Sequence, residues 1–192
     1  MVVKYPIITL ATISLFASGC TNDSSNSTAV IQSAEEVRAQ SIIETGVDLI
    51  PLEFFDWDLE LSDLAGQVIV MNFWASWCIP CLESFPTMLD ISSRYSSNDV
   101  RFITVNLDDY LDEYAYISAL DFLSSSRAQI ENYHLEQDLF EIYQFFGLEN
   151  IPTIIVYNRS EDEQTRLGNE GDLLEPLLVD AINQALDLPL GE

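Results

Sequence analysis

The stretch VIVMNFWASWCIPC, residues 68–81, carries the most informative pattern in the chain. Its first part, residues 68–74, is a nearly uninterrupted apolar run with β-branched side chains, which is typical of a strand buried on both faces. Apolar residues then recur at helical spacing over residues 82–91, so a helix is expected directly after the strand. The sequence therefore predicts that Cys78 lies at the N-terminus of a helix and Cys81 one turn further along.

The helix N-terminus determines the chemistry expected of this cysteine pair. Its backbone N–H groups and its macrodipole favour a thiolate at Cys78. Pro80 is tolerated there because the N–H that proline lacks has no partner in a first helical turn. Two residues between the cysteines allow the sulfurs to reach disulfide distance. We expect Cys78 to be the exposed nucleophile that attacks a partner's disulfide, and Cys81 to be the buried thiol that resolves the mixed disulfide.

Three other interpretations of the pair compete with this one. A structural zinc site needs about four ligands, and the chain offers two clustered cysteines and the lone His134 but no second CxxC, so no metal site is predicted. A purely structural disulfide occurs in exported proteins, but so short a loop would stabilise the fold little. A peroxiredoxin would carry Thr or Ser three residues before its cysteine, where this chain has Ala75.

The remainder of the chain alternates strand and helix patterns. Residues 51–67 are interpreted as an N-terminal β-hairpin followed by a short helical turn. Further strands are expected at residues 100–107, 153–158 and 165–168, and helices at residues 110–126, 135–147 and 173–186. This order predicts an α/β fold with a central β-sheet and helices on both of its faces.

Composition limits the possible partners. The chain has 32 acidic and 7 basic residues, a formal net charge of −25, and a hydrophobic fraction of 48% that indicates a globular protein. Nucleic acids are not expected partners, because binding their phosphates requires Lys and Arg. The acidic surface indicates either adaptation to a salty environment or a basic partner protein.

The N-terminal segment has the layout of an exported protein. Residues 1–19 combine one lysine with a short apolar run and small residues, which predicts a signal peptide. Cys20 follows these small residues and resembles the lipidated cysteine of bacterial lipoproteins, although an ordinary signal with an incidental cysteine is the alternative. Residues 20–45 are interpreted as a flexible tether, because their first half is rich in Ser, Asn and Thr, and residues 46–192 as the folded domain.

The stretch at residues 68–81, followed by LESFP at 82–86 and NIPTIIVY at 150–157, resembles the thioredoxin superfamily. It is most similar to the exported, membrane-anchored TlpA/ResA-like thiol–disulfide oxidoreductases of bacteria. The resemblance covers roughly residues 50–187 and implies a thioredoxin-like fold. It also implies that the peptide bond before Pro152 is cis, and that a bound partner contacts a surface made of Trp77, Ile79, Pro80, Ile151 and Pro152.

Two positions depart from that family. Asn72 occupies the place of the buried Asp with which cytoplasmic thioredoxins deprotonate the resolving thiol, and Ser84 occupies the place of a Glu found in many anchored relatives. Glu83 is a candidate proton acceptor for Cys81, and the alternative is that it only lies on a solvated helix face. The haem-biogenesis branch has GAPE where this chain has NIPT, so the chain is not assigned to that branch.

The expected function is reduction of disulfides in exported proteins, such as those in cytochrome c maturation. The expected location is the cell envelope, where the protein would be anchored to the membrane by its lipid on the periplasmic side. Ile79 and Pro80 add no charge between the cysteines, and acidic surroundings disfavour a thiolate, so a strong oxidant is not expected. A reductant in that compartment implies a membrane-embedded thiol donor. No cofactor is expected, and the protein is expected to be a monomer. The alternative is a thioredoxin-like lipoprotein that binds a partner without turnover.

Overall fold

The central strand is β2 (Val68–Trp74), and all seven of its residues are buried. It pairs in parallel with β3 (Val100–Asn106) and antiparallel with β5 (Thr153–Tyr157). Because β2 has a neighbour on each edge and helices over each face, almost every side chain along it is apolar. The structure is a computed structural model, and it describes residues 32–53, 66–168, 171 and 174–187.

In the described part of the chain, six strands form the sheet in the order β1-β4-β3-β2-β5-β6. The strands not yet named are β1 (Ile50–Glu53), β4 (Glu131–Glu136) and β6 (Glu163–Leu167). The first four strands of this order are parallel, and β5 and β6 run antiparallel to their neighbours. β1 pairs in parallel with β4, and the rest of the expected N-terminal hairpin, residues 54–65, lies outside the described residues.

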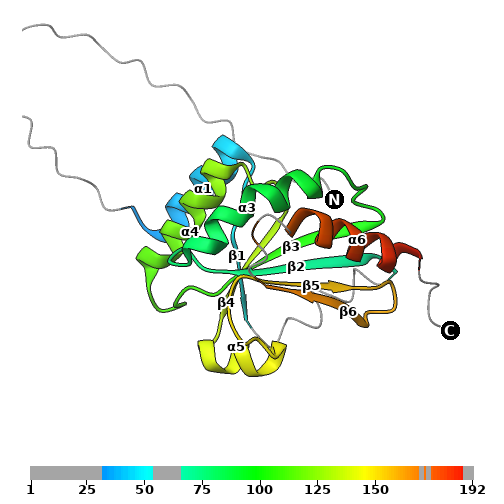
Figure 1. Ribbon diagram of the computed structural model, residues 1–192. Helices are drawn as coiled ribbons and strands as arrows, with labels where there is room; N and C mark the ends of the chain where they lie inside the picture. Colours follow the sequence, from blue (N-terminus) through cyan, green and yellow to red (C-terminus); the bar gives the residue numbers. More distant parts are fainter. Residues whose placement is uncertain (1–31, 54–65, 169–170, 172–173, 188–192) are drawn as a thin grey trace, which may run out of the picture. The chain divides into compact units, whose positions relative to one another are not determined.

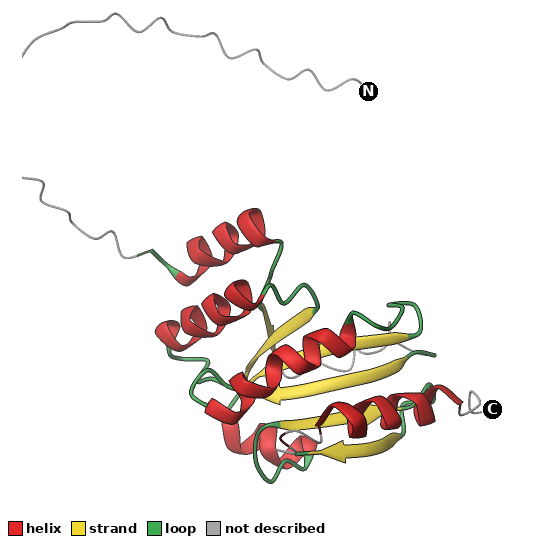
Figure 2. Ribbon diagram, turned by 45° about the horizontal axis from the view of Figure 1, so that its top comes forward, coloured by secondary structure: helices red, strands yellow, loops and turns green. Residues whose placement is uncertain are grey.

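Helices cover both faces of the sheet, as the sequence predicts (Figure 1). On one side lie α1 (Ala34–Thr45), α3 (Ile79–Ser92), α4 (Glu113–Ser126) and α6 (Leu174–Asp187), and on the other lies α5 (Leu139–Phe146). The tilted view in Figure 2 shows the larger layer of helices in front of the strands. Alternate residues of β2 serve the two cores: Val68, Val70 and Trp74 pack on the α3 side, and Ile69, Met71 and Phe73 pack on the α5 side.

Strand β4 corrects one prediction. A helix is predicted over residues 135–147, whereas residues 131–136 form a parallel strand and α5 begins only at Leu139. The side chain of Asp138 caps α5 by accepting the backbone N–H of Phe140 at 2.9 Å. Two of the buried residues of β4 are polar, Asn132 and His134, so the strand lacks the apolar run by which the sequence reveals β2.

Helix α1 corrects the predicted domain boundary. Residues 34–45, expected within the flexible tether, form a helix that packs along α4. Ser33 and Glu36 form a capping box at its N-terminus, which satisfies backbone donors that a free chain end would leave open. The folded unit accordingly begins near Gln32 and not at residue 46.

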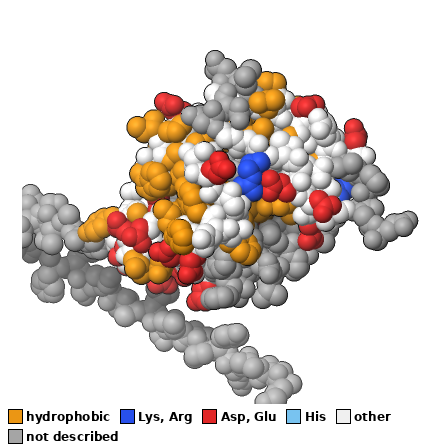
Figure 3. All heavy atoms as spheres, turned by 60° about the horizontal axis from the view of Figure 1, so that its bottom comes forward, with side chains coloured by type: hydrophobic (Ala, Val, Ile, Leu, Met, Phe, Trp, Pro, Cys, Tyr) orange, Lys and Arg blue, Asp and Glu red, His pale blue; other side chains and the backbone are white. Residues whose placement is uncertain are grey.

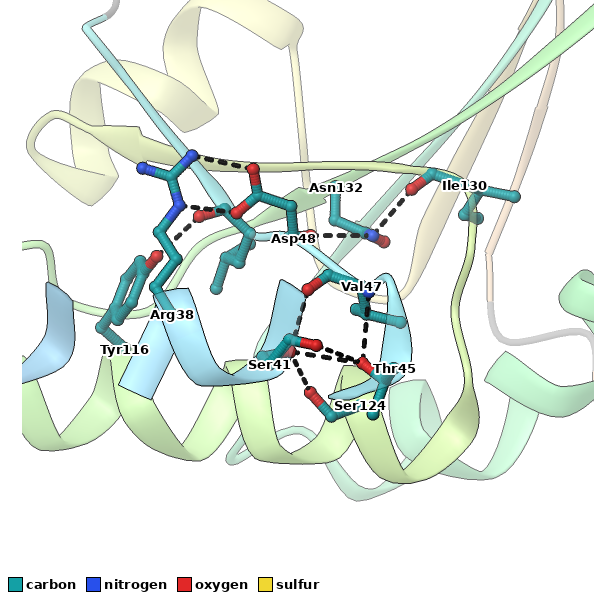
Figure 4. Close-up of polar contacts among 10 residues, drawn as sticks. Arg38, Ser41, Thr45, Val47, Asp48, Tyr116, Ser124, Ile130 and Asn132 are labelled. Carbon is teal, nitrogen blue, oxygen red and sulfur yellow. Dashed lines mark hydrogen bonds and ion pairs between the residues drawn. The ribbon is translucent and has the colours of Figure 1, made fainter. Parts of the chain in front are cut away.

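Polar contacts hold α1 against the domain (Figure 4). Arg38 binds Asp48 through two nitrogens, at 2.5 and 2.8 Å. The hydroxyl of Ser41 donates to the carbonyl of Val47 at 2.8 Å and lies 2.7 Å from the hydroxyl of Ser124 on α4. Because these contacts are polar, the helix needs few apolar residues, and its sequence therefore looks like a tether.

The predictions about export concern residues that are not described. The predicted signal peptide at residues 1–19 and the predicted lipidation of Cys20 lie outside the described residues and stay predictions. Within the described ranges, no helix combines the length and apolar character needed to cross a membrane.

Candidate active site

Cys78 and Cys81 form a disulfide at the start of α3, with their Cα atoms 5.2 Å apart. Cys78 is the N-cap residue of this helix, because β2 ends at Trp74 and a short turn brings the chain into α3. The Sγ atom of Cys78 accepts the backbone N–H of Cys81 at 3.3 Å. In the reduced protein the same donor, together with the helix dipole, would stabilise a Cys78 thiolate.

Cys78 is less exposed than the sequence predicts. Cys78 is 5% exposed and Cys81 is 1% exposed, so the expected order of exposure holds, but Cys78 is buried as well. The neighbouring side chains are exposed: Trp77 is 60% exposed and Ile79 is 68% exposed. Trp77 and Ile79 are therefore the exposed side chains on either side of the buried Cys78, and their role in binding a partner stays a prediction.

Trp74 packs in the core between the sheet and the helices α3 and α4, next to the cysteine loop. Its ring packs against Phe85 of α3, with centroids 5.2 Å apart, and against Phe122 of α4 at 5.3 Å. These two phenylalanines contact each other edge to face at 5.1 Å. Trp74 is fully buried, so of the two tryptophans that flank the cysteines only Trp77 is available to a partner.

The peptide bond between Ile151 and Pro152 is cis, as the family resemblance implies. Thr153, the next residue, pairs with Phe73 in the sheet, so Pro152 lies beside the end of β2 that leads into the cysteine loop. Pro152 is buried, whereas Ile151 is half-buried and packs against the core cluster that contains both cysteines. Their predicted role in binding a partner's backbone stays a prediction.

A buried carboxylate, which the sequence analysis did not single out, holds the cysteine loop. Asp108 is 3% exposed, and its oxygens accept the backbone N–H of Ser76 at 3.0 and 3.2 Å. Asn106 donates to the same carboxylate at 2.9 Å. A buried charge is stable only where hydrogen bonds replace its hydration. The loop two residues before Cys78 is therefore fixed to the carboxyl end of β3.

His134 extends this polar network away from the cysteines. Its Nδ1 atom lies 2.7 Å from Oδ1 of Asn106, the residue opposite it in the sheet register. Because a carbonyl oxygen can only accept, Nδ1 carries the proton in the neutral ring. Burial lowers the pKa of His134, against the opposing effect of the carboxylates of Asp108 and Asp109, so the ring is neutral at neutral pH. His134 thus belongs to the buried polar network that fixes the end of β3, and its side chain does not reach the cysteine pair through any of the contacts described.

Tyr116 covers the other side of this histidine. The two rings meet edge to face with centroids 5.3 Å apart, and the tyrosine hydroxyl donates to the carbonyl of Leu49 at 2.6 Å. Burial raises the pKa of Tyr116 to about 12, so the hydroxyl remains a donor. Over the described part of the chain, no group of three or more Asp, Glu, His or Cys side chains is arranged to hold a metal ion.

Glu83 has an exposed side chain on α3. It lies two residues after Cys81, which is about 200° around a helix, whereas Cys81 points into the core. Its role as proton acceptor stays a prediction. Ser84, in the position where many relatives carry Glu, donates its hydroxyl to the carbonyl of Cys81 at 3.1 Å.

A family model described as "Thioredoxin-like" matches residues 66–163, which is just over half of the chain. The chain belongs to the thioredoxin-like family. The match begins just before β2 and ends in β6, so it includes the cysteine pair, the Asp108 loop and the cis peptide bond.

Within this family the chain is similar to several bacterial proteins. It is 38% identical over 63 residues to the thiol-disulfide oxidoreductase ResA of Oceanobacillus iheyensis, covering 29% of this chain and 33% of that one. It is 39% identical over 51 residues to ResA of Bacillus subtilis, covering 27% and 28%. The chain thus matches a third or less of these relatives' length. The sporulation thiol-disulfide oxidoreductase A of B. subtilis is 26% identical over 124 residues, covering 62% and 73%.

Solved structures agree with this assignment. A protein from Chlorobium tepidum, described as a thiol:disulfide interchange protein DsbE, superimposes with a TM-score of 0.52 and 28% identity, covering 66% of this chain and 84% of that one. The thioredoxin-like superfamily protein SPOA0173 superimposes with a TM-score of 0.56 over 68% and 87%. Its identity of 20% supports the fold alone.

Proposed function

We propose that this protein is a thiol–disulfide oxidoreductase of the bacterial cell envelope that reduces disulfides in exported proteins. The observation that carries the proposal is the Cys78–Cys81 pair at the N-terminus of α3, in a thioredoxin-like fold with exposed side chains around it. The names of its ResA relatives describe the same chemistry.

The reaction starts from the reduced pair. The Cys78 thiolate attacks one sulfur of the client's disulfide, and the other client sulfur leaves as a thiolate that takes up a proton. Cys81 then loses its proton and attacks Cys78 in the mixed disulfide, which releases the second client thiol. The protein ends as the Cys78–Cys81 disulfide, and two electrons have passed to the client.

The surroundings of the pair support this direction of electron flow. Neither Ile79 nor Pro80 carries a charge, and the chain is strongly acidic, so a Cys78 thiolate lacks the extra stabilisation found in strong oxidants. Continued reduction needs a supply of electrons, which we assign to a membrane-embedded thiol donor. A lipid at Cys20 would hold a monomeric protein beside that donor. Clients of cytochrome c maturation fit this place.

The second candidate function is binding of a partner without turnover. Asn72, buried at 3% exposure, and Ser84 occupy positions where relatives carry proton acceptors, and this favours the second candidate. Insulin reduction separates the two functions, because a binding module would not accelerate it.

A redox titration against dithiothreitol and glutathione buffers, followed by thiol alkylation, tests the proposal directly. We expect one two-electron transition below about −220 mV. Cys78→Ser should abolish it, and Cys20→Ser, which removes the cysteine outside the pair, should not. A midpoint near −120 mV would make the protein an oxidant, and the absence of any transition would favour the binding module.

A further inference from the structure

A groove of about 500 Å³ opens beside the cysteine loop. It lies between Trp77, the loop after β3 at residues 107–111 and the start of α5 at residues 137–139. Four large side chains with apolar surface on its walls face water: Trp77 is 60% exposed, Leu111 is 78% exposed, and Tyr110 and Leu139 are each 41% exposed. A contiguous patch of exposed apolar side chains with a polar rim is typical of an interaction site.

The apolar surface continues beyond both ends of the groove. At the cysteine end Ile79 is 68% exposed, and on α5 Phe140 is 68% exposed beside a second hollow of about 420 Å³. Figure 3 shows the molecule from the side on which α5 lies, where hydrophobic side chains gather with acidic side chains among them. The exposed apolar side chains therefore come from three segments, the cysteine loop, the loop after β3 and α5, and together they can contact more than one side chain of a partner.

The charges of the groove are all negative. Asp109 and Asp138 lie on its rim and Asp108 on its floor, and none of the residues that line it is Lys or Arg. The two rim carboxylates are held in place: Asp109 accepts the backbone N–H of Leu111 at 3.0 Å, and Asp138 caps α5. The adjoining hollow contains Arg38, but Asp48 neutralises it.

We propose that this groove docks the client segment next to the disulfide, and that it selects segments in which basic side chains accompany aromatic or aliphatic ones. The proposal rests on the proposed function of the cysteine pair. Fixed negative charge on an apolar wall is complementary to such a segment. A second copy of this chain would bring the same carboxylates, and an anionic lipid surface would also be repelled.

The groove also gives a client a surface that orients it towards the buried Cys78. Cys78 is only 5% exposed, so a client disulfide must approach it in a defined orientation. Trp77 is at once a wall of the groove and the residue before Cys78. A segment seated between Trp77 and Leu139 therefore brings its cysteine to the nucleophile as an intramolecular encounter, which raises the rate of attack.

Two peptides of about nine residues test this selection. Each carries one cysteine as a mixed disulfide with glutathione, flanked by Arg and Phe in one and by Glu and Phe in the other. Reduced protein is mixed with each peptide, and formation of the Cys78–Cys81 disulfide, with release of glutathione and peptide thiol, is followed by quenching with an alkylating agent. Oxidised glutathione serves as a substrate that needs no groove.

Two double variants, each with two Asp→Asn substitutions, are compared; they remove the same charge from different places on the surface. Asp109→Asn with Asp138→Asn removes two charges from the groove and keeps the oxygens that accept the two backbone bonds. Asp180→Asn with Asp187→Asn removes two exposed charges from α6, on the other side of the sheet.

We expect the basic peptide to react about tenfold faster than the acidic one, with the ratio falling towards one at about 0.5 M NaCl. The groove pair should lower that ratio, and the α6 pair should preserve it. Equal rates for the two peptides, or an equal effect of both variant pairs, would show that the groove does not select the client. The proposed function of the cysteine pair would not be affected by that result. A dimer in sedimentation velocity whose formation slows the peptide reaction would assign the groove to a second copy. Failure to react even with oxidised glutathione would overturn the proposed function itself.

Discussion

The carboxylate of Asp108 accepts the backbone N–H of Ser76, two residues before the nucleophilic cysteine. This contact joins the end of β3 to the loop that leaves β2, in addition to the 2.8 Å bond from the N–H of Leu107 to the carbonyl of Trp74. The position of Cys78 therefore depends on a neighbouring strand as well as on its own helix.

Replacing Asp108 should be costly. Asp108→Asn replaces one carboxylate oxygen with an NH2 group, which cannot accept a hydrogen bond and faces the buried backbone N–H of Ser76 in either orientation of the amide. We expect the free energy of unfolding of the oxidised protein to fall by about 2–3 kcal/mol, measured by urea denaturation. Asp109→Asn, at the exposed neighbouring position, should change it by less than about 0.5 kcal/mol. Equal losses in the two variants would contradict the structural role of Asp108.

His134 should titrate below the ordinary range. Its pKa is lowered in the folded protein by burial, so between that pKa and about 6.5 the unfolded chain binds more protons than the folded chain. The contribution of His134 to stability is therefore complete above pH ~6.5 and is lost as the pH falls to its folded pKa. Because the chain has one histidine, a single imidazole resonance in NMR reports it without ambiguity.

The control for this prediction is His134→Gln, which keeps a side-chain donor for Asn106. Urea denaturation between pH 5 and 8, the range in which histidine titrates, should show a weaker fall of stability towards low pH in this variant. An imidazole midpoint at or above about 6.5 would show that the ring is more hydrated than the structure describes.

The aromatic cluster beneath the cysteines should be sensitive to truncation. Phe85 is fully buried between Trp74 and Phe122, so Phe85→Ala removes two ring contacts and leaves a cavity. We expect a loss of about 3–5 kcal/mol in the free energy of unfolding. Phe140→Ala, at a position that is 68% exposed, should cost less than about 1 kcal/mol. A small effect at Phe85 would mean that the cluster can rearrange around the gap.

Helix α1 should contribute to stability although it lies in the segment expected to be a tether. A chain that begins at Gln32 keeps the capping box and the Arg38–Asp48 pair, and a chain that begins at Gly46 loses both. We expect the shorter chain to be less stable by about 2–4 kcal/mol, from lost burial on α4 and lost polar contacts. Thermal unfolding of the two chains measures the difference. Equal midpoints would restore the boundary at residue 46.

The sequence was informative wherever an element is apolar. The run at β2 and the helix after it were both predictable, because burial on both faces and helical spacing of apolar residues leave clear patterns. The cis bond before Pro152 followed from the family resemblance and not from any local pattern.

The elements that the sequence did not reveal are those stabilised by polar groups. Strand β4 buries Asn132 and His134, and α1 is held by Arg38 and Ser41, so neither shows an apolar period. The network around Asp108 joins residues from different strands, and only the register that sets Asn106 opposite His134 brings them together. Polar residues directly after an apolar strand were the one available signal.

Helix α5 stands apart from the other described helices, on the opposite side of the sheet from α3 (Figure 1). It begins at the cap of Asp138 and ends at Gly147, whose φ of 60° closes the helix. The residues that set its outward face are thus separated by the whole sheet from the aromatic cluster under the cysteines. The exposed residues of α5 can therefore be exchanged for those of a relative's helix between these two fixed ends. We expect such an exchange to change which clients the protein prefers and to leave the cysteine pair intact.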